Sequence, residues 1–139
     1  MSVNVLYRTS AKATGGRDGH AATLDGTLDV KLTTPKELGG GGGAGNNPEQ
    51  LFAAGYSSCF GSAILAVAGK DKLKPEGVQV TAEVTLVVNG NDYSIAVKLK
   101  AKIDGVSREE AEKLLHTAHQ VCPYSKATRN NIPVELELV

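Results

Sequence analysis

The sequence predicts one α+β domain, with strands near both ends and in the middle of the chain and two helices between them. Three stretches carry this prediction. Residues 78–103 alternate between apolar and polar side chains around a turn, residues 51–69 contain no charged residue, and residues 107–122 repeat apolar side chains at helical spacing. A length of 139 residues fits a single domain, so we expect one domain over residues 1–139.

Composition and charge argue against several functional classes. Lys plus Arg number 15 and Asp plus Glu number 15, so the chain has no net positive charge with which to attract nucleic acid. Aromatic residues make up 4% and Trp is absent, which disfavours a surface for base stacking. We expect no nucleic acid partner. The start, MSVNVLYRTS, lacks the continuous apolar segment of a secretory signal, so we expect a cytoplasmic protein.

Alternation of apolar and polar side chains predicts the strands. It is clearest in a hairpin of residues 78–88 and 93–103, joined by the turn-forming residues Asn89 to Asp92. The second arm places its apolar side chains, from Tyr93 to Ile103, on one face. Shorter runs predict three more strands, over residues 3–13, 28–32 and 134–138.

The first helix is expected to begin after Asn47, a residue type favoured at the N-cap, with Pro48 at the first helical position and Glu49 in the first turn. Residues 51–69 carry no charge, and this length raises the alternative of a membrane-spanning helix. We reject that alternative because several Gly and Ser residues make the stretch only weakly apolar. A helix with small residues on every side is typical of the centre of a soluble core.

The second helix is expected to follow Ser107, because Ser107 and Glu110 have the spacing of a capping box. Apolar side chains then recur at steps of three and four residues as far as Cys122, so Cys122 points towards the buried face. Pro123 disfavours continuation of the helix and places Cys122 in its last turn.

The chain contains two cysteines, Cys59 in the first expected helix and Cys122 at the end of the second. One interpretation is that both are small buried hydrophobes without a chemical role. Neither belongs to a C-x-x-C motif, which argues against a zinc ribbon or a thioredoxin-type site. The other interpretation is a pair of thiols that only the fold brings together.

A reactive cysteine needs a nearby cation, because a thiol with a pKa of about 8.5 is mostly protonated at neutral pH. Arg17 is a candidate because it lies in a glycine-rich turn, although it also fits a solvated surface charge. Glu49 equally fits a carboxylate that interacts with its own helix dipole. Glu49 and Cys59 lie about 15 Å apart along a straight helix. A shared site would therefore combine residues from two copies whose first helices pack together.

Two further features have weaker chemical interpretations. His116 and His119 have a spacing compatible with two metal ligands, but no further His or Cys completes a set, so we expect no metal. The glycine run over 39–45 lacks the Gly-Lys-Ser/Thr ending of a phosphate-binding loop. We expect a flexible loop there and no bound cofactor.

Three segments resemble the organic hydroperoxide resistance (Ohr) proteins of the OsmC superfamily. They are ATGGR at 13–17, NPEQLFAAGYSSCF at 47–60 and AHQVCPYSKATRNNI at 118–132. The resemblance implies an OsmC-like fold, with antiparallel sheets around two principal helices, and an intertwined homodimer. It also implies a metal-free thiol peroxidase that reduces organic hydroperoxides, including those of fatty acids, to alcohols.

The same resemblance implies roles for individual residues. Cys59 matches the peroxidatic cysteine and Cys122 the resolving cysteine, while Arg17 and Glu49 match the pair that activates the thiolate and organises the peroxide. A lipoylated protein or dihydrolipoamide would reopen the disulfide. Three alternatives stay open: a general OsmC-type peroxidase, a cysteine-based redox sensor, and a dimer that binds apolar ligands with both cysteines inert. We expect no membrane partner.

Overall fold

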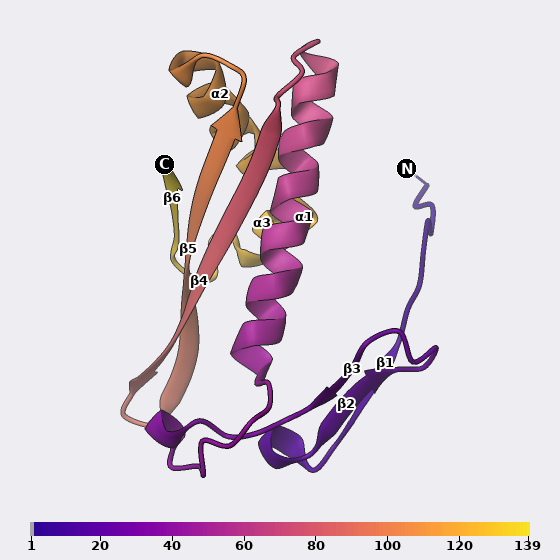
Figure 1. The fold of residues 1–139 in the computed structure, drawn as a ribbon, viewed down its shortest axis with the longest axis vertical. Coiled ribbons are helices and arrows are strands. Elements are labelled where there is room, and N and C mark those ends of the chain that lie inside the picture. Colours follow the sequence, from indigo (N-terminus) through magenta and orange to yellow (C-terminus); the bar gives the residue numbers. More distant parts are fainter. Residues whose placement is uncertain (1) are drawn as a thin grey trace. The chain divides into compact units, whose positions relative to one another are not determined.

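The computed structural model describes residues 2–139, which form two compact units (Figure 1). The N-terminal unit ends at Pro48, and the C-terminal unit spans Glu49–Val139. Helices and strands are both present, which confirms the α+β class. The expectation of one domain over residues 1–139 stays a prediction.

A three-stranded antiparallel sheet in the order β1-β2-β3 forms the centre of the N-terminal unit. Its elements are β1 (Ala11–Thr14), the 3-10 helix η1 (Gly16–Asp18), β2 (His20–Thr23), β3 (Asp29–Lys31) and the 3-10 helix η2 (Lys36–Leu38). The strand expected over 28–32 is therefore confirmed as β3.

The opening strand expected over 3–13 is wrong for most of its length, since β1 begins only at Ala11. Ala11 pairs with Thr23, the last residue of β2, and the chain then turns, with the Thr23 N–H bonded to the Leu28 carbonyl at 2.8 Å. A strand extends only as far as its partner supplies backbone hydrogen bonds. The sequence analysis missed β2 because its residues, HAAT, carry no alternating apolar pattern.

Arg17 lies in η1, within the tight connection between β1 and β2. Gly15 and Gly16 adopt positive φ values of 80° and 58°, which side-chain-bearing residues rarely adopt. Asp18 anchors this connection, because its carboxylate accepts a hydrogen bond from the Thr34 N–H at 3.0 Å. This backbone hydrogen bond, aided by one with the Thr34 side chain, lowers the pKa of the Asp18 carboxyl.

The C-terminal unit packs two long helices and one short helix against a three-stranded sheet in the order β4-β5-β6. Its elements are α1 (Pro48–Lys70), β4 (Gly77–Asn89), β5 (Asp92–Asp104), α2 (Arg108–Val121), α3 (Pro123–Thr128) and β6 (Val134–Leu138). Figure 1 shows α1 running along the β4–β5 hairpin. β4 pairs with β5 antiparallel, as expected, whereas β6 joins β5 in parallel.

The hairpin and the closing strand confirm the alternation. Val97, Leu99 and Ala101 of β5 are buried and belong to one core cluster with Phe60 of α1 and Leu114 of α2. Tyr93 lies on the expected face but is 67% exposed, because it stands at the tip of the hairpin beyond the helices.

The two long helices begin where their capping residues predict. α1 starts at Pro48 and ends at Lys70, and Ser107 caps α2 with both hydrogen bonds of a capping box to Glu110. By length and composition α1 is able to cross a membrane, but Tyr56, Phe60 and Ile64 bury its inner face in the core.

The second helix ends before Pro123, as expected, with Cys122 as its C-cap, but Pro123 also begins a short helix, α3, that the sequence analysis did not predict. Proline suits the first position of a helix because its missing N–H has no partner there in any helix. Cys122 accordingly lies between two helices as the C-cap of α2 and the N-cap of α3.

Gly19→Ala is predicted to open the connection that carries Arg17. A Cβ atom at Gly19 would overlap the backbone carbonyl of Thr14, so the turn must widen. We expect trypsin to cleave after Arg17 about 10-fold faster than in the wild type, corresponding to about 1.4 kcal/mol of easier local opening. Gly41→Ala is the matched control, because nothing lies within 4 Å of a Cβ atom there. Equal cleavage rates in the two variants would contradict this account of the turn.

Candidate functional site

The sulfur atoms of Cys59 and Cys122 lie 3.7 Å apart, and both residues are free thiols. Cys59 lies on α1 and is partly buried, whereas Cys122 is fully buried. A disulfide has an S–S length of about 2 Å, so a small closing movement would join the two sulfurs. The fold thus brings together the two cysteines that the sequence singled out.

The backbone of Cys122 is fixed from both sides. Its N–H donates to the Ala118 carbonyl at 2.9 Å, and its own carbonyl accepts from the Lys126 N–H at 3.0 Å. The first bond ends α2 and the second begins α3, so Cys122 belongs to the bend between the two helices. Its thiol therefore approaches α1 from a defined position.

The surroundings of Cys59 disfavour its thiolate. Burial is the largest cause that raises the pKa of the Cys59 thiol, and the hydrogen bond with the Cys122 thiol adds to it. A hydrogen bond with the Tyr124 backbone lowers the pKa and offsets only part of this effect. These neighbours by themselves leave Cys59 protonated at neutral pH, so nucleophilic chemistry requires a further positive charge.

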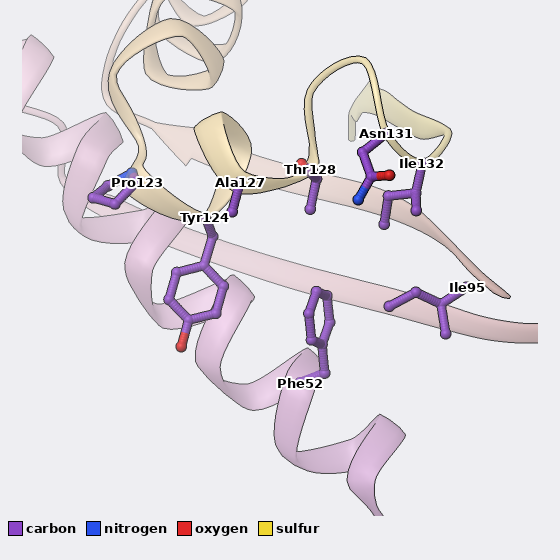
Figure 2. A pocket seen from close by; sticks show the side chains of 8 residues that line it. All are labelled: Phe52, Ile95, Pro123, Tyr124, Ala127, Thr128, Asn131 and Ile132. Atoms are coloured by element: carbon purple, nitrogen blue, oxygen red, sulfur yellow. The ribbon is translucent and has the colours of Figure 1, made fainter. Parts of the chain in front are cut away.

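An apolar pocket of about 480 Å³ (Figure 2) is lined in part by Tyr124, whose backbone forms a hydrogen bond with the Cys59 thiol. Pro123 and Tyr124, which directly follow Cys122, form part of its wall, and Phe52 of α1 lies opposite. The complete lining is Phe52, Ile95, Pro123, Tyr124, Ala127, Thr128, Asn131 and Ile132. This volume and this lining suit the hydrocarbon part of a small organic molecule.

Gly55 allows Tyr124 to lie close to α1. A Cβ atom at Gly55 would lie 2.8 Å from the Tyr124 hydroxyl oxygen and 3.3 Å from its ring. The Tyr124 ring packs 5.6 Å from the Tyr56 ring and 6.2 Å from the Phe52 ring, measured between centroids. α3 is thereby seated directly on the part of α1 that precedes Cys59.

The other two predicted site residues are Arg17 and Glu49. Arg17 is partly buried in η1 of the N-terminal unit, and its pairing with Cys59 stays a prediction. Glu49 lies in the first turn of α1, which is continuous as far as Lys70. The rise from Glu49 to Cys59 is therefore about 15 Å along the helix.

The two histidines of α2 have different partners. His116 lies 3.6 Å from a carboxylate oxygen of Glu112, whereas Nδ1 of His119 lies 2.7 Å from the Ser125 hydroxyl oxygen. Within residues 2–139, no three His, Cys, Asp or Glu side chains are grouped so that they could hold a metal ion.

Sequence reasoning missed the residues that line the pocket. Phe52, Tyr124 and Ile132 come from segments whose side chains meet only in the folded chain, so no local periodicity marks them. The available signal was the apolar and aromatic content of residues 123–132, which the sequence analysis treated as a motif and not as a pocket wall.

Comparison with known proteins agrees with this geometry. The sequence model of the OsmC-like protein family matches residues 40–137. An organic hydroperoxide resistance protein of Xanthomonas axonopodis pv. citri is 52% identical over 135 residues, covering 96% of this chain and 95% of the relative.

Solved structures of similar proteins also match nearly the whole chain. The crystal structure of an organic hydroperoxide resistance protein OsmC from Legionella pneumophila matches with a TM-score of 0.92 and 49% identity, covering 97% of this chain and 98% of that one. The organic hydroperoxide resistance protein OhrB of Bacillus subtilis matches with a TM-score of 0.88 and 39% identity, covering 97% of this chain and 100% of that one. The chain therefore belongs to the OsmC-like protein family and, within it, to the organic hydroperoxide resistance (Ohr) proteins.

Proposed function

We propose that this protein is a metal-free thiol peroxidase that reduces organic hydroperoxides, including those of fatty acids, to alcohols. The observation that carries the proposal is the 3.7 Å separation of the Cys59 and Cys122 sulfurs beside an apolar pocket. Relatives named for resistance to organic hydroperoxides support the same substrate class.

In the first step the Cys59 thiolate attacks the terminal oxygen of the hydroperoxide. The S–O bond forms as the O–O bond breaks, and the departing alkoxide takes up a proton to become the alcohol. Cys59 is oxidised to a sulfenic acid. Cys59 is assigned this role because it is partly exposed, whereas Cys122 is fully buried and suited to the second step.

In the second step the Cys122 thiol attacks the sulfenic sulfur of Cys59. The S–S bond forms, the S–O bond breaks, and the hydroxyl group leaves with the thiol proton as water. A lipoyl-type dithiol, carried by a lipoylated protein or supplied as dihydrolipoamide, then reduces the disulfide. Its first thiolate forms a mixed disulfide and releases one protein thiolate, and its second closes the lipoyl ring and releases the other.

Arg17 supplies the positive charge that Cys59 lacks in its own surroundings. Its guanidinium group stabilises the thiolate and the charge that develops on the peroxide oxygens. Glu49 orients Arg17 through a hydrogen-bonded ion pair, because a carboxylate beside the thiolate would by itself raise the pKa of Cys59.

The complete site belongs to a homodimer in which first helices pack together. Glu49 and Cys59 cannot meet on one continuous α1, so the partner's helix has to supply one of them. An exposed face of α1 suits this packing, because small residues recur there at four-residue steps. They are Ala54, Ser58, Ser62 and Ala66.

Three alternatives from the sequence analysis predict different behaviour. A redox sensor oxidises the same cysteines but needs an output surface, and residues 2–139 form no basic recognition helix. A dimer that binds apolar ligands would leave both thiols unreactive. A general OsmC-type peroxidase would use the same two cysteines. We propose a cytoplasmic location, where reducing conditions return the disulfide to two thiols.

Replacing the cysteines tests the cycle. With cumene hydroperoxide and dihydrolipoamide, Cys59→Ser is expected to lower kcat/KM at least about 1,000-fold, because the nucleophile is lost. Cys122→Ser is expected to consume about two equivalents of hydroperoxide and then to stop, with Cys59 as sulfinic acid in the intact mass, because the sulfenic acid reacts with a second hydroperoxide when no resolving thiol is present. Hydrogen peroxide should react more slowly, since it leaves the apolar pocket empty. Unchanged turnover in Cys59→Ser would refute the mechanism.

Replacing Arg17 tests the source of the positive charge. In a Cys122→Ser background, Arg17→Ala is expected to move the pH midpoint of Cys59 alkylation by iodoacetamide upward by about 1 to 2 units. Less thiolate is then present at neutral pH, so alkylation at pH 7 slows by about 10-fold or more. Arg8→Ala, which removes an exposed arginine of the same unit, is the matched control. Identical midpoints in the two variants would exclude Arg17 as the activating charge.

Mixing protomers tests whether the site is shared. In a heterodimer of Glu49→Ala and Cys59→Ser chains, one site keeps an intact Cys59 together with Glu49 from the other chain. We expect about half of the wild-type turnover, equal to that of a heterodimer of wild-type and Cys59→Ser chains. Turnover no higher than that of the Glu49→Ala homodimer would show that Glu49 acts within its own chain.

A further inference from the structure

A group of buried hydrogen-bonding side chains connects α3 to both long helices beside the thiol pair. The Tyr56 hydroxyl of α1 lies 2.8 Å from the Ser125 hydroxyl and 3.1 Å from the Thr128 hydroxyl, both on α3. Nδ1 of His119 on α2 lies 2.7 Å from the Ser125 hydroxyl. Tyr56 and Ser125 are fully buried and Thr128 is 5% exposed. The proposed chemistry uses none of these four residues, which we call the hydroxyl relay.

The hydrogens of the relay run in one direction. Thr128 donates its only hydroxyl hydrogen to the Ser125 backbone carbonyl at 3.1 Å, so it accepts from Tyr56. Tyr56 then has no second hydrogen and accepts from the Ser125 hydroxyl. The Ser125 hydroxyl in turn accepts from His119, which carries its hydrogen on Nδ1. Each hydroxyl group therefore donates one hydrogen bond. Hydrogen bonds connected in series polarise and strengthen one another.

The charge state of His119 agrees with this order. Burial, followed by the nearby positive charge of Arg129, lowers the pKa of His119 and keeps the ring neutral. The Arg129 guanidinium also donates to the His119 backbone carbonyl at 2.7 Å. His119 is thus held at its ring and at its backbone.

The relay residues flank both cysteines in the sequence. His119 and Ser125 each lie three residues from Cys122, on opposite sides, and Tyr56 lies three residues before Cys59 on α1. Residues three apart share a helix face, so Tyr56 and Cys59 face the same neighbours. Any loosening of the relay therefore acts first on the separation between α1 and the bend that carries Cys122.

Resting on the proposed peroxidase cycle, we propose that Tyr56, Ser125, Thr128 and His119 are positioning residues that hold Cys122 within reach of Cys59, so that disulfide formation outruns a second oxidation. The competing reaction is attack of the Cys59 sulfenate on another hydroperoxide, which yields sulfinic acid and a second alcohol. The disulfide route requires the sulfurs to close from 3.7 Å to about 2 Å. A displacement of about 1 Å is enough to slow such a step up to about 100-fold.

Single hydroxyl removals test the relay with little change of shape. Tyr56→Phe and Thr128→Val each delete one hydroxyl, while Thr128→Ser keeps it and removes a methyl group. Tyr93→Phe is the matched control, because Tyr93 is 67% exposed on β5. Each protein is treated with increasing cumene hydroperoxide, and intact mass spectrometry gives the ratio of sulfinic acid to disulfide. The rate of the first sulfenic acid formation is recorded separately.

We expect Tyr56→Phe and Thr128→Val to reach equal sulfinic acid and disulfide at about 10-fold lower hydroperoxide than the wild type. The first oxidation rate of Tyr56→Phe should stay within about twofold of the wild type. Tyr93→Phe should match the wild type in both measurements, and Thr128→Ser should keep the wild-type ratio of sulfinic acid to disulfide. The Thr128 pair is sufficient for the test if Tyr56→Phe fails to fold.

Two results would overturn the proposal and leave the peroxidase function intact. One is a wild-type ratio in both hydroxyl-free variants, and the other is an equal change in Thr128→Ser and Thr128→Val, which would assign the effect to packing. A wild-type protein that consumes hydroperoxide without forming the disulfide, or consumes none, would instead refute the proposed function itself.

Discussion

The packing of α1 against the bend between α2 and α3 is the contact on which the rest of the site depends. Tyr56 and Phe60 of α1 are fully buried in the same core as Cys122. The packing of this core therefore sets the distance between the two sulfurs. Close-packed interiors adjust little, and a thiol pair held by such a core keeps its spacing without a covalent bond. Gly55 is part of the same contact, because only a residue without a side chain leaves room for Tyr124.

The protonation state of the Cys59 thiol depends on its surroundings and on the proposed cation. The surroundings of Cys59 in the C-terminal unit raise the pKa of its thiol, while the candidate activating cation, Arg17, belongs to the N-terminal unit. A protonated thiol is protected from indiscriminate oxidation, because the thiolate is the nucleophile. The β1–β2 connection fixes Arg17 locally through two glycines with positive φ and through Asp18.

Local signals in the sequence predicted the elements whose cause is local. The β4–β5 hairpin, the start of α1 at Pro48 and the capping box of Ser107 follow from alternation, proline placement and side-chain capping over a few residues. The parallel pairing of β6, the pocket wall and the hydroxyl relay depend on contacts between distant segments, which no periodicity encodes. The cysteines could be singled out beforehand, but their 3.7 Å separation required the fold.

In the proposed cycle, α3 connects substrate binding with resolution of the oxidised cysteine. Tyr124 and Ala127 line the apolar pocket, Ser125 takes part in the hydroxyl relay, and Thr128 belongs to both. A helix of six residues has no independent stability, so its position is set by the contacts made by these side chains. Under this proposal, a substrate that fills the pocket contacts the same helix that positions Cys122. Substitutions that reshape the pocket for other hydroperoxides therefore also act on disulfide formation, and the two properties cannot be tuned separately on this helix.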